Sequence, residues 1–121
     1  MDFYFDDERP IYIQLVEQLE LYIVTGHFPP GERLPSVRDL ASIAKVNPNT
    51  MQRALTELED KRLIITERTN GKFVTDDQEF LCKQQQQFAR EKIQKFLSEM
   101  QELGISRTEI IEYLQSLKRK D

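Results

Sequence analysis

The sequence predicts a mainly α-helical chain with a small β wing: a winged helix-turn-helix domain followed by a two-helix C-terminal dimerisation tail. Three observations lead to this fold class. Two short amphipathic segments stand about three residues apart, a β-hairpin signal follows them directly, and the composition becomes polar and glutamine-rich farther on. We therefore expect a winged domain over residues 1–75 and a helical tail over residues 76–121.

The first periodic segment is PIYIQLVEQLELYIVTG, in which apolar residues recur at four-residue steps and form one helix face. Pro10 suits a first helical turn and Gly26 suits the residue after a helix, so a helix is predicted over roughly residues 10–25. The HFPPGERLP stretch that follows holds three prolines and one glycine. This composition predicts a turn with a short extended piece near Arg33 and Leu34.

The two segments that define the helix-turn-helix each begin with a capping residue. Ser36 is expected to cap a helix over about residues 36–44, with an aspartate three residues on in the position of a capping box. Asn47 is expected to cap the second helix, over residues 47–59, which a proline opens. The hairpin signal LIITERTNGKFV then places β-branched residues before a turn-favouring Asn-Gly pair and predicts a wing over residues 63–75.

The tail is predicted to be a long polar helix that Gly104 ends, followed by a last helix that starts at Ser106 with Glu109 completing a capping box. Apolar residues along the long helix step by four and three, the spacing of a coiled-coil seam. Because nothing else in the chain is long enough to cover this seam, apart from the last helix, we expect a homodimer. The expected interface residues are Ala89, Ile93, Phe96, Met100, Leu103, Ile110 and Leu114.

Charge is distributed unevenly along the chain. The net charge is −4, but residues 1–8 alone hold four acids and no base. Residues 33–53 hold four bases and one acid, so the helix-turn-helix is locally basic. A basic neighbourhood favours a polyanionic partner, whereas the acidity belongs to the start of the chain.

Several classes of function are not expected. The sequence has no apolar run of the roughly 20 residues that a membrane-spanning helix needs and its start is acidic, so we expect no membrane association and a cytoplasmic location. The single cysteine, Cys82, and single histidine, His27, cannot form a disulfide or supply a zinc site. The sequence places no Cys or Ser arrangement beside His27 and no basic cluster near Cys82 that would activate a thiol. We therefore expect a protein that is not an enzyme and has no cofactor and no metal site.

Candidate DNA-binding residues follow from the docking geometry of a helix-turn-helix, whose second helix enters the major groove by its N-terminal end. Amide, hydroxyl and guanidinium groups can read base edges or bind phosphates there. An ordinary solvated helix surface is the alternative interpretation of the same residues. The complete set of candidates is Ser36, Arg38, Lys45, Asn47, Asn49, Thr50, Gln52, Arg53, Arg68, Asn70, Gly71 and Lys72.

Residues 10–74 also resemble a known family. The PGERLPSVRDLA stretch, the VNPNTMQRAL helix and the LI…GKFV wing, in that order, are similar to the DNA-binding domain of the GntR family of bacterial transcription regulators. VNPNT with a short helical tail resembles the YtrA-like subfamily. The resemblance implies that Arg38 contacts DNA, that the helix starting at Asn47 lies in the major groove, and that Gly71 reaches the minor groove.

The expected function is therefore that of a dimeric transcriptional regulator that binds an inverted-repeat operator in double-stranded DNA, and the subfamily resemblance implies that it is a repressor. Where some GntR branches carry arginines, this chain has Pro48 and Gln52, so their base preference does not transfer. Two alternatives stay open. One is that the winged helix is a protein-interaction module without DNA binding. The other concerns a small-molecule effector: the tail is too short to enclose one alone, but a pocket at the dimer interface could bind it.

Overall fold

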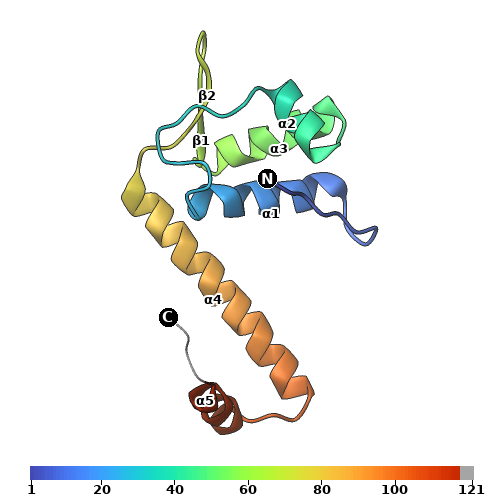
Figure 1. The fold of residues 1–121 in the computed structure, drawn as a ribbon, viewed down its shortest axis with the longest axis vertical. Helices are drawn as coiled ribbons and strands as arrows, with labels where there is room; N and C mark the ends of the chain where they lie inside the picture. The colour runs from blue at the N-terminus through green and yellow to red at the C-terminus, as the bar shows by residue number, and fades with distance from the viewer. Residues whose placement is uncertain (118–121) are drawn as a thin grey trace. The chain divides into compact units, whose positions relative to one another are not determined.

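The computed structural model describes residues 1–117, which form two compact units divided between Gln85 and Gln86 (Figure 1). The first unit contains α1 (Ile11–Val24), α2 (Val37–Ala44), α3 (Pro48–Asp60), β1 (Ile64–Glu67) and β2 (Gly71–Val74). A long helix, α4 (Gln78–Glu102), starts in the first unit, and α5 (Arg107–Ser116) belongs to the second. A mainly helical chain with a two-stranded antiparallel wing confirms the predicted fold class.

One contiguous core holds the first unit together. α1 lies beside α3 and runs in the same direction, because Tyr12 contacts Arg53 near one end and Glu20 pairs with Lys61 near the other. The apolar stripes of α1, α2 and α3 meet between the helices and continue under the wing, as their spacing predicts. The side chains buried most completely are Leu15, Leu19, Ile23, Leu40, Met51, Leu55, Leu58, Leu63 and Val74.

Capping side chains fix where α2 and α3 begin. The Ser36 hydroxyl oxygen accepts from the Asp39 N–H at 3.1 Å, and Asn47 Oδ1 accepts from the Asn49 N–H at 2.7 Å. Both predicted caps are confirmed. For α2 the structure shows only this half of a capping box, and the aspartate side chain is one methylene shorter than the glutamate that usually reaches back.

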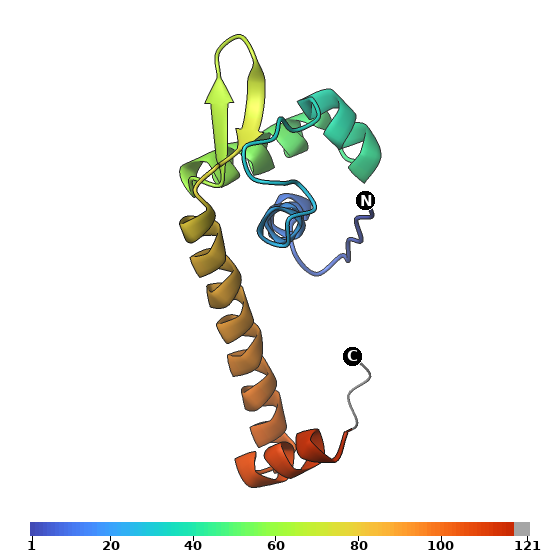
Figure 2. The ribbon, with the colours of Figure 1, turned by 60° about the vertical axis from the view of Figure 1, so that its left-hand side comes forward.

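The wing is a hairpin to which a third extended segment is attached. Ile64 pairs with Val74 and Glu67 with Gly71, and the Asn70 N–H donates to the Glu67 carbonyl at 3.3 Å, which closes the turn. On the far side of β2, Arg33 forms an antiparallel bridge with Phe73, so the short extended piece predicted there is confirmed. Figure 2 shows the hairpin standing beside this connection into α2.

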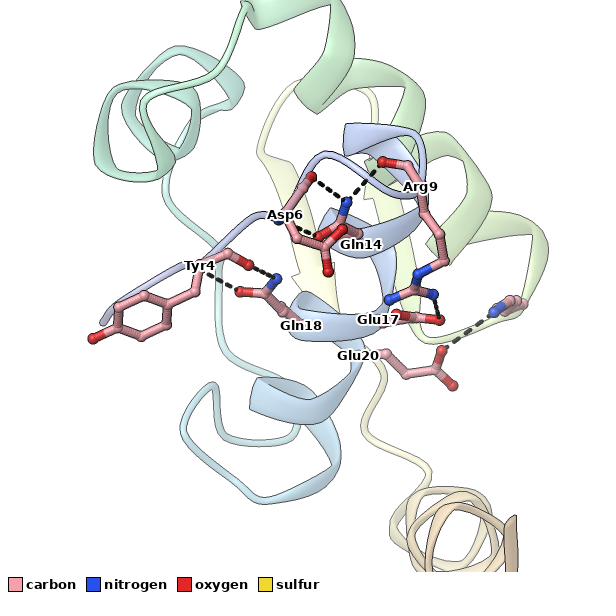
Figure 3. Close-up of polar contacts among 8 residues, drawn as sticks. Tyr4, Asp6, Arg9, Gln14, Glu17, Gln18 and Glu20 are labelled. Atoms are coloured by element: carbon pink, nitrogen blue, oxygen red, sulfur yellow. Dashed lines mark hydrogen bonds and ion pairs between the residues drawn. The ribbon is translucent and has the colours of Figure 1, made fainter. Parts of the chain in front are cut away.

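Residues 2–6 lie along α1 as an N-terminal arm, which the sequence did not predict (Figure 3). Gln18 accepts from the Tyr4 N–H at 3.0 Å and donates to the Tyr4 carbonyl at 2.7 Å. Gln14 makes the same pair of bonds with Asp6, and the Tyr22 hydroxyl bonds both main-chain groups of Asp2. Four helical residues rise by about 6 Å and two extended residues by about 6.6 Å, so this register fits the arm to the helix.

The second unit is described from Gln86 to Leu117. α4 ends at Glu102 with Gly104 in the left-handed conformation, φ 77°, and the Ile105 N–H donates to the Met100 carbonyl at 2.9 Å. These are features of a Schellman motif, and they confirm the predicted helix end. The capping box between Ser106 and Glu109 is also confirmed, with bonds of 3.1 Å in both directions. Residues 118–121, at the end of the predicted tail, lie outside the described residues.

Across the part of the chain that the structure describes, no helix combines the length and apolar character that crossing a bilayer requires.

Candidate nucleic-acid interface

The N-terminal half of α3 presents polar side chains away from the core. Met51, Ala54 and Leu55 are buried, whereas Asn49 and Gln52 are exposed. Thr50 is half-buried, and the side chain of Asn47 is already engaged in capping the helix. Gln52 Nε2 donates to the Thr56 hydroxyl at 3.3 Å, a long bond that a better acceptor can replace at little cost. Asn49 and Gln52 are thus the amides available to a base edge.

Arg53 is held differently from the other residues of this helix. Its guanidinium carbon lies 3.6 Å from the centroid of the Tyr12 ring on α1. A cation over an aromatic face gains electrostatic attraction, so the ring fixes the arginine at the edge of α3 that faces α1. Tyr12 lies in the amphipathic segment for which a helix over residues 10–25 was predicted, and the periodicity of that segment did not identify this contact, because the two residues are far apart in the sequence.

Two bases flank α2. Arg38 lies in its first turn, next to the N-terminus that Ser36 caps, and Lys45 lies at its C-terminal cap with a φ of 57°. Both side chains belong to exposed residues, and within residues 1–117 neither forms an ion pair. A helix N-terminus with an unpaired arginine is a favourable place for a phosphate.

Lys72 of the wing is bound within the protein. Its ammonium lies 2.6 Å from Glu59 Oε1 on α3 and 2.9 Å from the Thr66 hydroxyl on β1, and its side chain is 16% exposed. Partial burial alone raises the pKa of Glu59, but hydrogen bonds from Lys72 and Thr66 and the Lys72 charge lower that pKa below its ordinary value. This cluster ties the wing to α3, the helix predicted to enter the major groove. The charge of Lys72 is therefore paired within the protein and is not free.

At the wing tip, Arg68 is exposed, and Asn70 donates to the Glu67 carboxylate at 3.3 Å. Gly71 has a φ of 98°, which favours glycine. A Cβ placed on Gly71 would lie 3.1 Å from Nε and 3.3 Å from Nη2 of Arg33, so the guanidinium of Arg33 covers this glycine. Arg33 was counted in the basic run of the sequence but was not identified as part of the wing.

Cationic residues without an ion pair in residues 1–117 therefore surround the start of the recognition helix and the wing. They are Arg33, Arg38, Lys45, Arg53 and Arg68. No group of three or more His, Cys, Asp or Glu residues in this range is arranged to hold a metal ion. A winged helix with exposed amides on its recognition helix and unpaired bases around it defines the class of winged-helix DNA-binding proteins.

Comparisons with known proteins give the family. Residues 11–74 match the model of the bacterial regulatory proteins of the gntR family, and the chain belongs to this family. It is 37% identical over 112 residues to the HTH-type transcriptional regulator YhcF of Bacillus subtilis (strain 168), which covers 93% of each chain. It is 41% identical over 68 residues to the HTH-type transcriptional repressor YtrA of the same organism, 56% of this chain and 52% of that one.

A solved structure of a GntR family transcriptional regulator from Listeria monocytogenes is similar along nearly the whole chain. The TM-score is 0.86 with 40% identity, over 94% of this chain and 100% of that chain. The match extends beyond the winged domain, so the helical tail belongs to the shared architecture. The chain is thus a GntR-family transcriptional regulator with a winged-helix DNA-binding domain.

The predicted interface residues of the tail are not buried within the chain. They lie on α4 and α5, except for Leu103, which follows the last residue of α4. Met100 and Ile110 are half-buried, and the others are exposed, Leu103 by 70% and Phe96 by 41%. Exposed apolar side chains that recur along one helix face indicate a surface that another molecule covers.

Proposed function

We propose that the chain binds a specific operator in double-stranded DNA through α3 and the wing, and that it represses transcription there. The observation that carries the proposal is the outward face of the start of α3, where Asn49 and Gln52 stand in positions that a merely solvated helix usually fills with Glu and Lys. Asparagine and glutamine can pair with adenine through two hydrogen bonds. Repression is proposed from the similarity to the YtrA repressor.

We further propose that two copies bind an inverted repeat. The seam of α4 supports this, because Ala89, Ile93, Phe96 and Leu103 are exposed in the single chain. A two-fold dimer would cover this seam with the same residues of the second copy and present two recognition helices. Half-sites would then lie about one helical turn of DNA apart, ~10 base pairs, or a multiple of it.

Selection of bound duplexes from a random pool tests the proposal. We expect enrichment of two copies of a short motif in inverted orientation, and we expect a reporter promoter that contains the selected duplex to be silenced by the protein. If no motif is enriched although the protein is folded, the result would contradict DNA recognition by sequence and favour the protein-interaction module. Enrichment of a single unrepeated motif would contradict the dimer alone.

A further inference from the structure

Arg33 occupies a fixed position on the wing although it precedes α2 in the sequence. The Leu34 N–H donates to the Lys72 carbonyl at 2.8 Å, and the Val74 N–H donates to the Glu32 carbonyl at 2.9 Å. Together with the bridge between Arg33 and Phe73, these bonds attach residues 32–34 to β2 as a short extended segment. The main chain of Arg33 is therefore set by the same sheet that positions the hairpin.

The side chain of Arg33 lies on the face of the wing that points away from α3. Thr66 and Lys72 are register partners and both take part in the cluster with Glu59 of α3, so they define the inner face. Residues alternate between faces along a strand, which places Gly71 and Phe73 on the outer face together with Arg33. The contact of the guanidinium with Gly71, 3.1 Å from the position of a Cβ, agrees with this placement.

The guanidinium of Arg33 has no carboxylate partner within residues 1–117. Glu67, the register partner of Gly71, instead accepts a hydrogen bond from Asn70. The other cation of the wing strands, Lys72, is neutralised by Glu59. Arg33 thus supplies a charge with free hydrogen-bond donors where the sequence pattern suggested Lys72.

Residues 33–38 connect the wing to α2, with Arg33 at the wing end and Arg38 at the helix end. In the proposed complex α3 occupies the major groove and the wing faces the adjacent minor groove. A minor groove is bounded by two sugar–phosphate strands, and the face of the wing that points away from α3 turns toward the strand farther from α3.

We propose that Arg33 binds a phosphate of this farther strand, with Gly71 as the surface on which its guanidinium rests. A planar guanidinium donates two parallel hydrogen bonds to phosphate oxygens, and its position against the sheet lowers the entropy lost on binding. The proposal rests on the proposed function and adds to it a DNA contact that neither the helix-turn-helix nor the hairpin supplies.

The test compares Arg33→Ala with Arg62→Ala on the duplex selected from the random pool and on a scrambled duplex of the same composition. Arg62 is a matched control, since it is also an exposed arginine without an ion pair in residues 1–117 but follows the C-terminal end of α3. Loss of one phosphate contact should make the plot of log K against log salt shallower by about 0.9 and weaken binding roughly eightfold at 0.1 M salt. Both duplexes should lose affinity equally, and Arg62→Ala should change neither quantity.

Arg33→Lys distinguishes the lost charge from a disturbed wing. A lysine keeps the charge that a phosphate needs, so its salt dependence should match that of the wild type. An unchanged slope in Arg33→Ala, a loss confined to the selected duplex, or a lysine variant as weak as the alanine variant would each overturn the phosphate contact. Wild-type binding to the selected duplex tests the proposed function separately, because it does not depend on any Arg33 variant.

Discussion

The partner of each basic side chain decides what it contributes to DNA binding. Lys72 is paired with Glu59, whereas Arg38 has no ion pair within residues 1–117, nor has Arg53, which rests on the neutral ring of Tyr12. Charge that is already neutralised inside the protein releases fewer counterions from DNA than free charge does. A count of basic residues in the sequence therefore overstates the charge that faces DNA.

Replacement of Arg38 and of Gln52 by alanine is expected to change DNA binding in different ways. Arg38→Ala should weaken binding to all duplexes by a similar factor, because a phosphate contact carries no sequence information. Gln52→Ala should lose ~1–3 kcal/mol of discrimination at one base pair, because an amide that reads a base edge is specific. Fluorescence anisotropy titrations on single-base variants of the selected duplex measure both effects. Equal losses on every duplex in both variants would contradict the assignment of Gln52.

The Glu59 cluster makes a prediction about pH. Glu59→Gln should lower the free energy of unfolding by about 1 kcal/mol at pH 7, because the charged partner of Lys72 is lost. The folded-state pKa of Glu59 is lowered, so its contribution is fully present above the ordinary value of 4.5 and is lost as the pH falls through the folded-state pKa. The difference between wild type and variant should therefore shrink in strongly acidic solution.

Urea unfolding at a series of pH values measures that difference. Glu57→Gln is the control, since this neighbouring acid of α3 has no ion pair within residues 1–117. A Glu59→Gln difference that stays constant from neutral to strongly acidic pH would show that the carboxylate charge is not what stabilises the wing.

At the scale of elements, the N-terminal arm gives a prediction that does not involve DNA. Gln18→Ala removes both hydrogen bonds to the main chain of Tyr4 and should lower the free energy of unfolding by about 1–2 kcal/mol. The Tyr4 amide should lose protection from hydrogen exchange, because exposed hydrogen bonds open locally once their partner is gone.

Gln18→Glu is the matched variant for the arm. It has nearly the same size and can still accept from the Tyr4 N–H, but it cannot donate to the Tyr4 carbonyl. Its Tyr4 amide should stay more protected than that of the alanine variant. Equal protection of this amide in wild type and Gln18→Ala would mean that the hydrogen bonds from Gln18 do not hold the arm on α1.

Local patterns predicted the elements well. The caps at Ser36, Asn47 and Ser106, the end of α4 at Gly104 and the short extended piece near Arg33 depend on a few neighbouring residues, and each is confirmed. The fold class follows from the order of such elements.

Contacts between distant residues could not be predicted in this way. The stacking of Arg53 on Tyr12, the pairing of Lys72 with Glu59 and the position of Arg33 over Gly71 each join different elements. Their residues are ordinary helix or strand residues when they are read locally. Only the packing of α1, α3 and the wing brings them together. This packing changes the interpretation of two basic candidates, Arg53 and Lys72, and adds Arg33, which was not a candidate.

At the scale of the whole molecule, the apolar seam of α4 predicts the state of association. Phe96→Asp should convert a dimer into a monomer in sedimentation equilibrium, because a carboxylate in the seam would be buried without a partner. Gln87→Asp is the control, since nine residues at 3.6 per turn place it on the opposite side of α4. A Phe96→Asp protein that remains dimeric would show that the seam is not the interface.

The central claim is that this GntR-family regulator recognises DNA by sequence, and the ratio of two affinities tests it most directly. The dissociation constants for the selected duplex and for a scrambled duplex of the same composition should be measured in the same buffer at physiological salt. Specific regulators typically prefer their sites by about 10³-fold or more, and we expect a ratio in that range together with steep salt dependence for both duplexes. Equal affinities for the two duplexes would contradict the account.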